Sequence, residues 1–202
     1  MKPMNPKPVP TPEFAALLLA GGQSRRMGRN KADLPWQGQS LLQHLSDLLK
    51  QAGARRIWHS GPFQGEHALP DSEPGLGPMG GVLSLARVAD NGLYLVVPVD
   101  MPRLEAGLLQ HLLRALDQVE PTVRAACFVD FPLPLALRLD EASRDLIEQH
   151  AQRERSARSL RALHQGLAGI HCPVPNGCRD LLDNCNTPEQ WQALSRVQLT
   201  SA

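Results

Sequence analysis

Short apolar runs that alternate with helical patterns are the feature that most restricts the fold of this chain. The runs Phe14–Ala20 and Leu93–Val99 are almost entirely apolar, which is typical of strands buried on both faces. Between Leu41 and Ala52, and again between Leu108 and Leu116, leucines recur at the spacing of one apolar helix face. This alternation predicts an α/β fold, a three-layer sandwich with a mostly parallel, Rossmann-like sheet.

The expected ends of the helices and strands are inferred from helix-capping residues and from glycine and proline, which interrupt regular structure. Ser40 is a predicted N-cap, and Gly53 a predicted stop, of the first long helix. The segment Gly61–Gly81 is rich in Gly and Pro, and it is interpreted as an active-site loop. Further strands are expected at 55–60, 125–129, 133–139 and 169–172, and further helices at 81–89, 105–119, 141–150, 156–165 and from 188 onward.

Length and composition indicate one domain, expected over residues 13–202. The 202 residues are 42% hydrophobic, which is enough for a sizeable core. Residues 1–12 are proline-rich and lack the apolar middle of a signal peptide, so we expect a disordered leader and a cytoplasmic protein. No apolar run reaches the roughly 18 to 20 residues that span a bilayer. The net charge of +1 argues against nucleic acid or a membrane as a partner.

The cysteines and histidines form no local metal-binding pattern. The four cysteines include no CxxC pair, and the seven histidines are scattered along the chain. Structural zinc is therefore not expected from the spacing. Ordinary reduced thiols are the expectation for a protein of this compartment.

A glycine turn with basic residues follows the first predicted strand. Gly21 and Gly22 let the backbone approach a phosphate closely, and Arg25 and Lys31 add cationic charge. The loop matches neither the Walker pattern nor GxGxxG. The favoured interpretation is phosphate binding, and the structural alternative is a turn with solvated basic side chains.

Asp100 directly follows the apolar strand Leu93–Val99. Ligands in open α/β sheets bind beyond the carboxyl ends of the strands, and magnesium prefers one or two carboxylates with phosphate oxygens and water. Asp100 is therefore a candidate magnesium ligand. An aspartate that caps the turn before Met101 and Pro102 is the equally weighted structural alternative.

Two further segments could contact ligands. Asp71 precedes the glycine-rich stretch Gly75–Gly81, which could wrap a flat ligand, although its composition alone favours a surface loop. Asn184 and Asn186 would point the same way in an extended segment and could hold a polar ligand. A turn whose amide groups are hydrogen-bonded within the protein is an equally good interpretation, because Thr187 and Pro188 form a typical helix start.

Together these segments resemble the molybdenum cofactor guanylyltransferases, within the wider nucleotidyltransferase superfamily. The resemblance extends over nearly the whole chain beyond residue 12, with the segments in the family's order. Its matching stretches are LLLAGGQSRRMGRNK (17–31), PGLGPMGGVLSL (74–85), VVPVDMP (96–102), PLPLALRL (132–139), SARSLRAL (156–163) and DNCNTPEQW (183–191). The chain departs from the family where Leu133 precedes Pro134, and where a strand ends in Ser60 rather than asparagine.

The resemblance implies a role for each candidate residue. Lys31 and Arg25 would act on the triphosphate, and Asp100 would hold Mg²⁺. The nucleoside side would be formed by Leu19, Ala20, Gly21, Gly22, Asp71 and Ser60. Asn184 and Asn186 would lie near the pterin.

The reaction implied by the resemblance is transfer of GMP from GTP to molybdopterin, with release of pyrophosphate. Molybdoenzymes or their chaperones would receive the dinucleotide product. Ala20-Gly21-Gly22, in place of the Ala-Ala-Gly of many relatives that use cytidine or uridine, favours guanine. The alternatives are a cytidylyl- or other nucleotidyltransferase, and a non-catalytic protein that binds and delivers the cofactor. A dinucleotide-dependent oxidoreductase is disfavoured because GxGxxG is absent.

Overall fold

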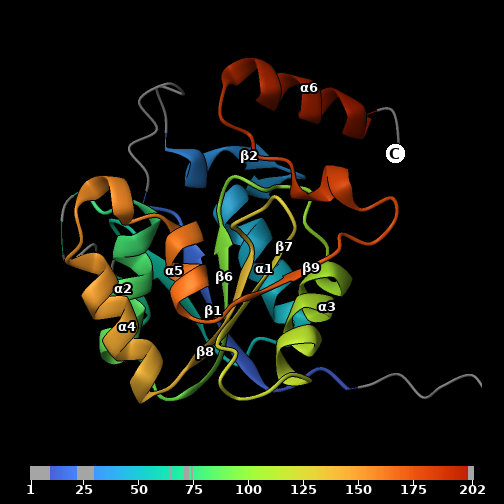
Figure 1. Cartoon of the computed structure of the whole chain (residues 1–202). Coiled ribbons are helices and arrows are strands. Elements are labelled where there is room, and N and C mark those ends of the chain that lie inside the picture. Colours follow the sequence, from blue (N-terminus) through green and yellow to red (C-terminus); the bar gives the residue numbers. More distant parts are fainter. Residues whose placement is uncertain (1–9, 22–29, 64, 71–72, 74, 200–202) are drawn as a thin grey trace, which may run out of the picture.

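The computed structural model describes residues 10–21, 30–63, 65–70, 73 and 75–199 (Figure 1). In this part of the chain a seven-stranded sheet has the order β5-β4-β1-β6-β8-β7-β9. All its strands run in one direction except β8, which is antiparallel to both of its neighbours. The strands are β1 Phe14–Leu19, β4 Ile57–Ser60, β5 Ala68–Leu69, β6 Gly92–Pro98, β7 Ala125–Phe128, β8 Leu135–Leu139 and β9 Ile170–Cys172.

Helices cover both faces of the sheet, so the fold has three layers (Figure 1). One face is covered by α1 Leu41–Ala52 and α3 Ala106–Asp117, and the other by α2 Pro78–Val88, α4 Glu141–Ala151 and α5 Leu160–Gly166. Three short 3-10 helices are described at Lys31–Asp33, Arg155–Ala157 and Arg179–Leu182. The predicted three-layer α/β class is confirmed, with a mixed sheet that is mostly parallel.

The C-terminal helix α6, Pro188–Leu199, lies over a small hairpin outside the main sheet (Figure 1). The hairpin pairs β2, Pro35–Trp36, with β3, Gln39–Ser40. Trp36 packs against Trp191 of α6, with ring centroids 5.3 Å apart. This contact joins the end of the chain to the segment that carries Lys31. None of the described helices combines the length and apolar character that crossing a bilayer requires.

Local signals placed several boundaries correctly. The Ser40 hydroxyl accepts a hydrogen bond from the Gln43 amide, and Gly53 adopts φ 103°, so the predicted cap and stop of α1 are confirmed. The central strands β1 and β6 are buried along most of their length, as their apolar sequences predicted. Pro98 is the last residue of β6, where its missing N–H interrupts no ladder inside the strand.

Most predicted boundaries differ from the structure by at most two residues, but two segments differ by more. The segment 61–81 is not all loop, because β5 pairs with β4 and α2 begins at Pro78, whose ring suits the first helical turn. The helix expected from residue 156 begins at Leu160 instead, because the Ser159 hydroxyl accepts a hydrogen bond from the Ala162 amide.

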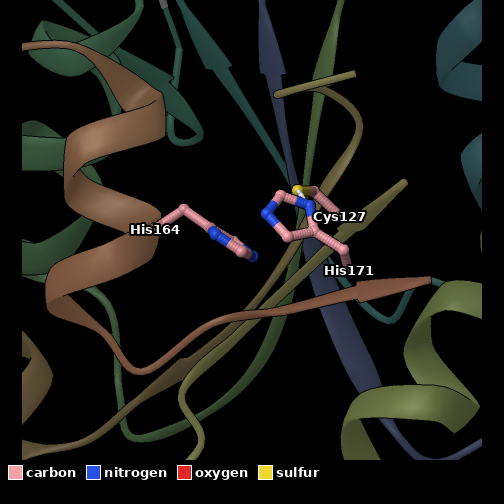
Figure 2. A group of neighbouring side chains, drawn as sticks. All are labelled: Cys127, His164 and His171. Carbon is pink, nitrogen blue, oxygen red and sulfur yellow. Dashed lines mark hydrogen bonds between the residues drawn. The ribbon is translucent and has the colours of Figure 1, made fainter. Parts of the chain in front are cut away.

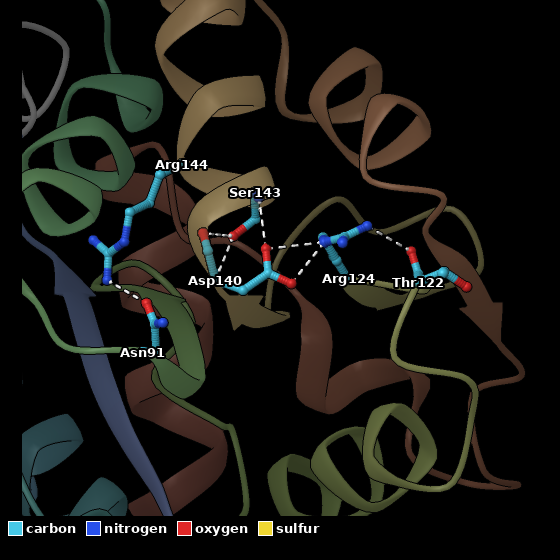
Figure 3. A network of polar contacts seen from close by, with 6 residues as sticks. All are labelled: Asn91, Thr122, Arg124, Asp140, Ser143 and Arg144. Carbon is cyan, nitrogen blue, oxygen red and sulfur yellow. Dashed lines mark hydrogen bonds and ion pairs between the residues drawn. The ribbon is translucent and has the colours of Figure 1, made fainter.

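A polar network fixes the start of α4 to the sheet (Figure 3). The Asp140 carboxylate accepts hydrogen bonds from the Ser143 amide at 2.7 Å and from Arg124 Nε at 2.8 Å, and the Ser143 hydroxyl accepts one from the Asp140 amide at 2.8 Å. One turn along α4, Arg144 donates to the Ala89 carbonyl at 2.6 Å and to Asn91 at 3.0 Å. The network therefore ties α4 to the end of α2 and to the start of β7.

We expect Asp140→Asn to lower the free energy of unfolding by about 1 kcal/mol at pH 7, the usual worth of such a charge-assisted contact. Burial opposes the Asp140 charge, but the Ser143 and Arg124 hydrogen bonds outweigh it and lower the pKa of the carboxyl. A lowered folded-state pKa stabilises the fold above the unfolded pKa, and this stabilisation is lost as the pH falls through the folded pKa. Urea unfolding should therefore show a difference at pH 7 that vanishes in acid. The exposed Asp145→Asn on the same helix is the matched control.

Candidate active site

The ends of strands β1, β4 and β6 form the base of the site. Leu19 and Pro98 are register partners, and the Val99 amide donates to the Leu19 carbonyl at 2.9 Å. On the other side the Ala20 amide donates to the Ser60 carbonyl at 2.9 Å. The segment Leu19 to Gly21 is thus held between two neighbouring strands, at the edge where parallel α/β sheets bind ligands.

Glycines let the backbone segments at this edge come unusually close. A Cβ on Gly21 would lie 2.9 Å from the Gly61 Cα. A Cβ on Gly81, in the first turns of α2, would lie 2.5 Å from Leu19 Cδ2 and 2.6 Å from Ser60 Oγ. Gly21 and Gly81 therefore have packing roles, in addition to the ligand contact predicted for Gly21.

We expect Gly81→Ala to destabilise the protein by about 1–3 kcal/mol, the range seen when a packed interior is overfilled. The added methyl would push α2 away from Leu19 and from the buried Ser60. Thermal unfolding measures the loss. Gly107→Ala is the control, because a Cβ there has no neighbour within 4 Å and Gly107 also lies within a helix. Equal unfolding temperatures for the two variants would contradict the packing role.

Lys31, Asp100 and Asn186 meet above these strand ends. Lys31 Nζ lies 3.0 Å from Asp100 Oδ2 and donates a hydrogen bond to Asn186 Oδ1 at 2.6 Å. The Lys31 and Asp100 side chains are only 16% and 21% exposed, so this ion pair is shielded from water more than a surface pair is. The Asn30 side chain caps the 3-10 turn that presents Lys31. We call these three side chains the Lys31 junction.

A backbone hydrogen bond holds the segment 184–186 next to Asp100. The Cys185 amide donates to the Asp100 carbonyl at 2.8 Å. Cys185 is buried, whereas Asn184 and Asn186 on either side are exposed, as alternation in an extended segment predicts. The Gln190 side chain accepts hydrogen bonds from the amides of Asn186 and Thr187, so the start of α6 supports the Lys31 junction.

The structure thus brings together many of the predicted site residues. Lys31 contacts both Asp100 and Asn186, and Asn184 is two residues from the second contact. Ser60 is 2% exposed beneath Gly81, so its nucleoside contact stays a prediction. The predicted residues Gly22, Arg25 and Asp71 lie outside the described residues.

Sequence reasoning missed how several of these residues are held. The Lys31–Asn186 hydrogen bond joins residues 155 positions apart, and no local sequence pattern predicts it. It also missed the fit of Gly81 against Ser60, because the composition of Gly75–Gly81 favoured a surface loop. The structure corrects this for residues 78–81, which are helical. A glycine in an apolar helical run was the available signal for close packing.

Comparison with known proteins identifies the family. Residues 16–168 match the MobA-like NTP transferase domain. Over 90% of its length the chain is 42% identical to a molybdenum cofactor guanylyltransferase from Xanthomonas euvesicatoria pv. vesicatoria, of which the match covers 94%. The chain belongs to the molybdenum cofactor guanylyltransferases of the MobA-like family. It is accordingly a nucleotidyltransferase, as its resemblance to this family implied.

Solved structures show that this guanylyltransferase family shares its fold with other transferases. The molybdopterin-guanine dinucleotide biosynthesis protein A of Archaeoglobus fulgidus superposes with a TM-score of 0.72 at 18% identity, covering 92% of this chain and 99% of that one. A 2-C-methyl-D-erythritol 4-phosphate cytidylyltransferase from Thermus thermophilus gives 0.62 at 18% identity, covering 89% and 98%. The fold alone therefore does not decide which base is used.

The Lys31 junction has the chemistry needed to handle a polyphosphate and a hard cation. Its carboxylate and amide oxygens are donors that Mg²⁺ prefers, and a single carboxylate leaves coordination positions for phosphate oxygens and water. Lys31 contributes a compact positive charge at the same point. These donors fit magnesium better than a soft metal.

Proposed function

We propose that this guanylyltransferase transfers GMP from GTP to molybdopterin, releases pyrophosphate and forms molybdopterin guanine dinucleotide. The observation that carries the proposal is the Lys31 junction at the ends of β1 and β6, in a chain 42% identical to a named molybdenum cofactor guanylyltransferase. A cation and a carboxylate at one strand edge suit a metal-bound triphosphate.

Each described side chain of the Lys31 junction is assigned a role. Asp100 would hold Mg²⁺, and Lys31 would offset the charge of the triphosphate. Magnesium, when bound, supplies positive charge and orients the phosphate oxygens. Asn186 contacts Lys31 directly. The segment with Asn184 and Asn186, which is assigned to the pterin, would therefore lie next to the bound triphosphate at the Lys31 amine.

The reaction needs alignment more than acid–base chemistry. An oxygen of the molybdopterin phosphate attacks the α-phosphorus of GTP, and the bond from that phosphorus to the bridging oxygen of the β-phosphate breaks. The electron pair leaves with pyrophosphate. Because the attacking phosphate is already anionic, no strong general base is required. Lys31 and the backbone N–H groups of the glycine turn would stabilise the charge that develops.

The nucleoside side rests on the rigid strand ends. Leu19 and Ala20 are fixed by backbone hydrogen bonds with Val99 and Ser60, and Gly21 packs closely against Gly61, which would pre-organise a surface for guanine and ribose. Gly22, Asp71 and Ser60 are proposed to complete it, with Arg25 on the phosphates. The Ala-Gly-Gly sequence supports guanine over cytosine.

The direct test is to incubate the full-length protein with Mg²⁺, molybdopterin and each of the four nucleoside triphosphates. Pyrophosphate and the dinucleotide product should appear with GTP far faster than with the other three. A faster reaction with CTP than with GTP would indicate that the protein is a cytidylyltransferase. Tight binding of molybdopterin without pyrophosphate from any triphosphate would indicate a delivery protein instead. Transfer of the product to molybdoenzymes or their chaperones remains a separate prediction.

A further inference from the structure

A second cluster of donor atoms lies between α5 and the strands β7 and β9 (Figure 2). It consists of Cys127 on β7, His171 on β9 and His164 on α5. One donor atom of each side chain lies within 4.8 Å of the other two. Cys127 Sγ is 3.4 Å from His171 Nδ1, and the two imidazole rings have centroids 4.6 Å apart. We call these residues the Cys127 cluster.

Strand register explains why these residues converge. Cys127 and His171 are register partners on the parallel strands β7 and β9, so their side chains share one face of the sheet. The next residue, Phe128, points to the opposite face, where its ring stacks on His111 of α3. Because α5 covers the first face, His164 meets the other two there (Figure 2).

The His164 ring is fixed by a hydrogen bond to the backbone. Its Nε2 lies 3.0 Å from the Ile170 carbonyl, which can only accept, so Nε2 carries the proton and Nδ1 keeps a lone pair. A backbone carbonyl in this position is a usual outer partner of a histidine ligand, because it fixes the ring and its tautomer. The ring also lies directly against Gly169, where a Cβ would overlap it.

The Cys127 cluster has room and access for an ion. Its three residues line a cavity of about 90 Å³ together with Asp130, Arg161 and others. That volume holds an ion with a water molecule. Cys127 and His164 are buried, whereas His171 is exposed, so an ion could enter past His171.

We propose that Cys127, His164 and His171 bind a divalent transition-metal ion, with zinc as the preferred ion. One thiolate and two imidazoles match the ligands of zinc, and a water molecule in the cavity would complete a tetrahedral site. Binding converts the Cys127 thiol to a zinc-bound thiolate and releases one proton to solvent. The site is distinct from the oxygen donors at Asp100, which suit magnesium.

A reactive cysteine is the rival interpretation of a Cys–His contact. Activated cysteines have a lowered pKa and an electropositive, accessible setting. Burial instead raises the pKa of the Cys127 thiol to about 11. The two buried members and the fixed His164 ring favour a binding site over a nucleophile.

Zinc binding to the full-length protein tests the proposal. The protein is stripped with EDTA and dialysed against Zn²⁺ in excess Mg²⁺, which occupies oxygen sites, and bound zinc is measured by atomic absorption. We expect about one Zn²⁺ per chain. Co²⁺ should produce the absorption band of a thiolate–cobalt bond.

Matched variants separate the site from unspecific binding. His171→Asn, at an exposed position, and Cys127→Ser should each weaken zinc binding at least about tenfold, the smallest loss usual even for an outer-shell partner. Cys127→Ser should also lose the cobalt band. Cys178→Ser and His111→Gln should bind zinc as the wild type does. The proposal is overturned if the wild type does not bind stoichiometric zinc. It is also overturned if His171→Asn binds zinc with wild-type affinity, even if Cys127→Ser binds zinc weakly.

Discussion

Asp100→Asn should lower the rate of pyrophosphate release from GTP by about 10²–10³-fold, because the carboxylate proposed to hold Mg²⁺ loses its charge while the shape of the side chain is kept. The fold should survive, since it is the backbone carbonyl of Asp100 that receives the Cys185 amide. Steady-state kinetics over a range of Mg²⁺ concentrations measures both the lower rate and a weaker response to magnesium.

The control for this variant is Asp117→Asn, which removes a carboxylate from an exposed position at the end of α3. Its activity and magnesium response should match those of the wild type. Wild-type magnesium dependence in Asp100→Asn would show that the metal binds elsewhere, and the assignment of Asp100 would then have to be abandoned.

Lys31→Met should reduce kcat/KM for GTP by about 10²–10³-fold, the loss expected when one preorganised positive group is removed from a phosphoryl-transfer site. Methionine fills a similar volume without charge, and Lys31 is only 16% exposed, so packing should change little. Lys31→Arg should restore activity poorly, because a planar guanidinium cannot replace a compact ammonium held between Asp100 and Asn186.

Lys50→Met is the matched control, because Lys50 forms an exposed ion pair with Asp47 on α1. Combining Lys31→Met with Asp100→Asn gives a sharper test. The two side chains share one contact, so the double variant should lose much less than the product of the two single losses. Losses that simply multiply would mean that Lys31 and Asp100 act independently.

Local patterns were sufficient for most of the elements. Burial on both faces requires a continuous apolar run, and this identified β1 and β6. Ser40 and Gly53 bound α1 through hydrogen bonding and a left-handed backbone within a few residues. Capping and strand burial are decided by neighbours in the chain, so they can be inferred without knowing the tertiary structure.

Residues adjacent in sequence were a poorer guide to secondary structure where tertiary packing sets the conformation. Composition made Gly75–Gly81 resemble a loop, yet its last four residues begin α2, because Pro78 starts the helix and Gly81 fits against Ser60. The reversed direction of β8 between β6 and β7 also depends on pairing across the sheet. Neither outcome follows from the residues adjacent in sequence.

At both proposed sites, the sequence and the tertiary structure contribute different information. The sequence by itself determined which types of residue are proposed for the nucleotide site, including a glycine turn with Lys31 and an aspartate after a strand. Only the tertiary structure placed Asn186 on Lys31, and only strand register placed Cys127 beside His171. Distances between residues far apart in the chain are set by how strands pair and helices pack, and no spacing rule along a single sequence contains that information.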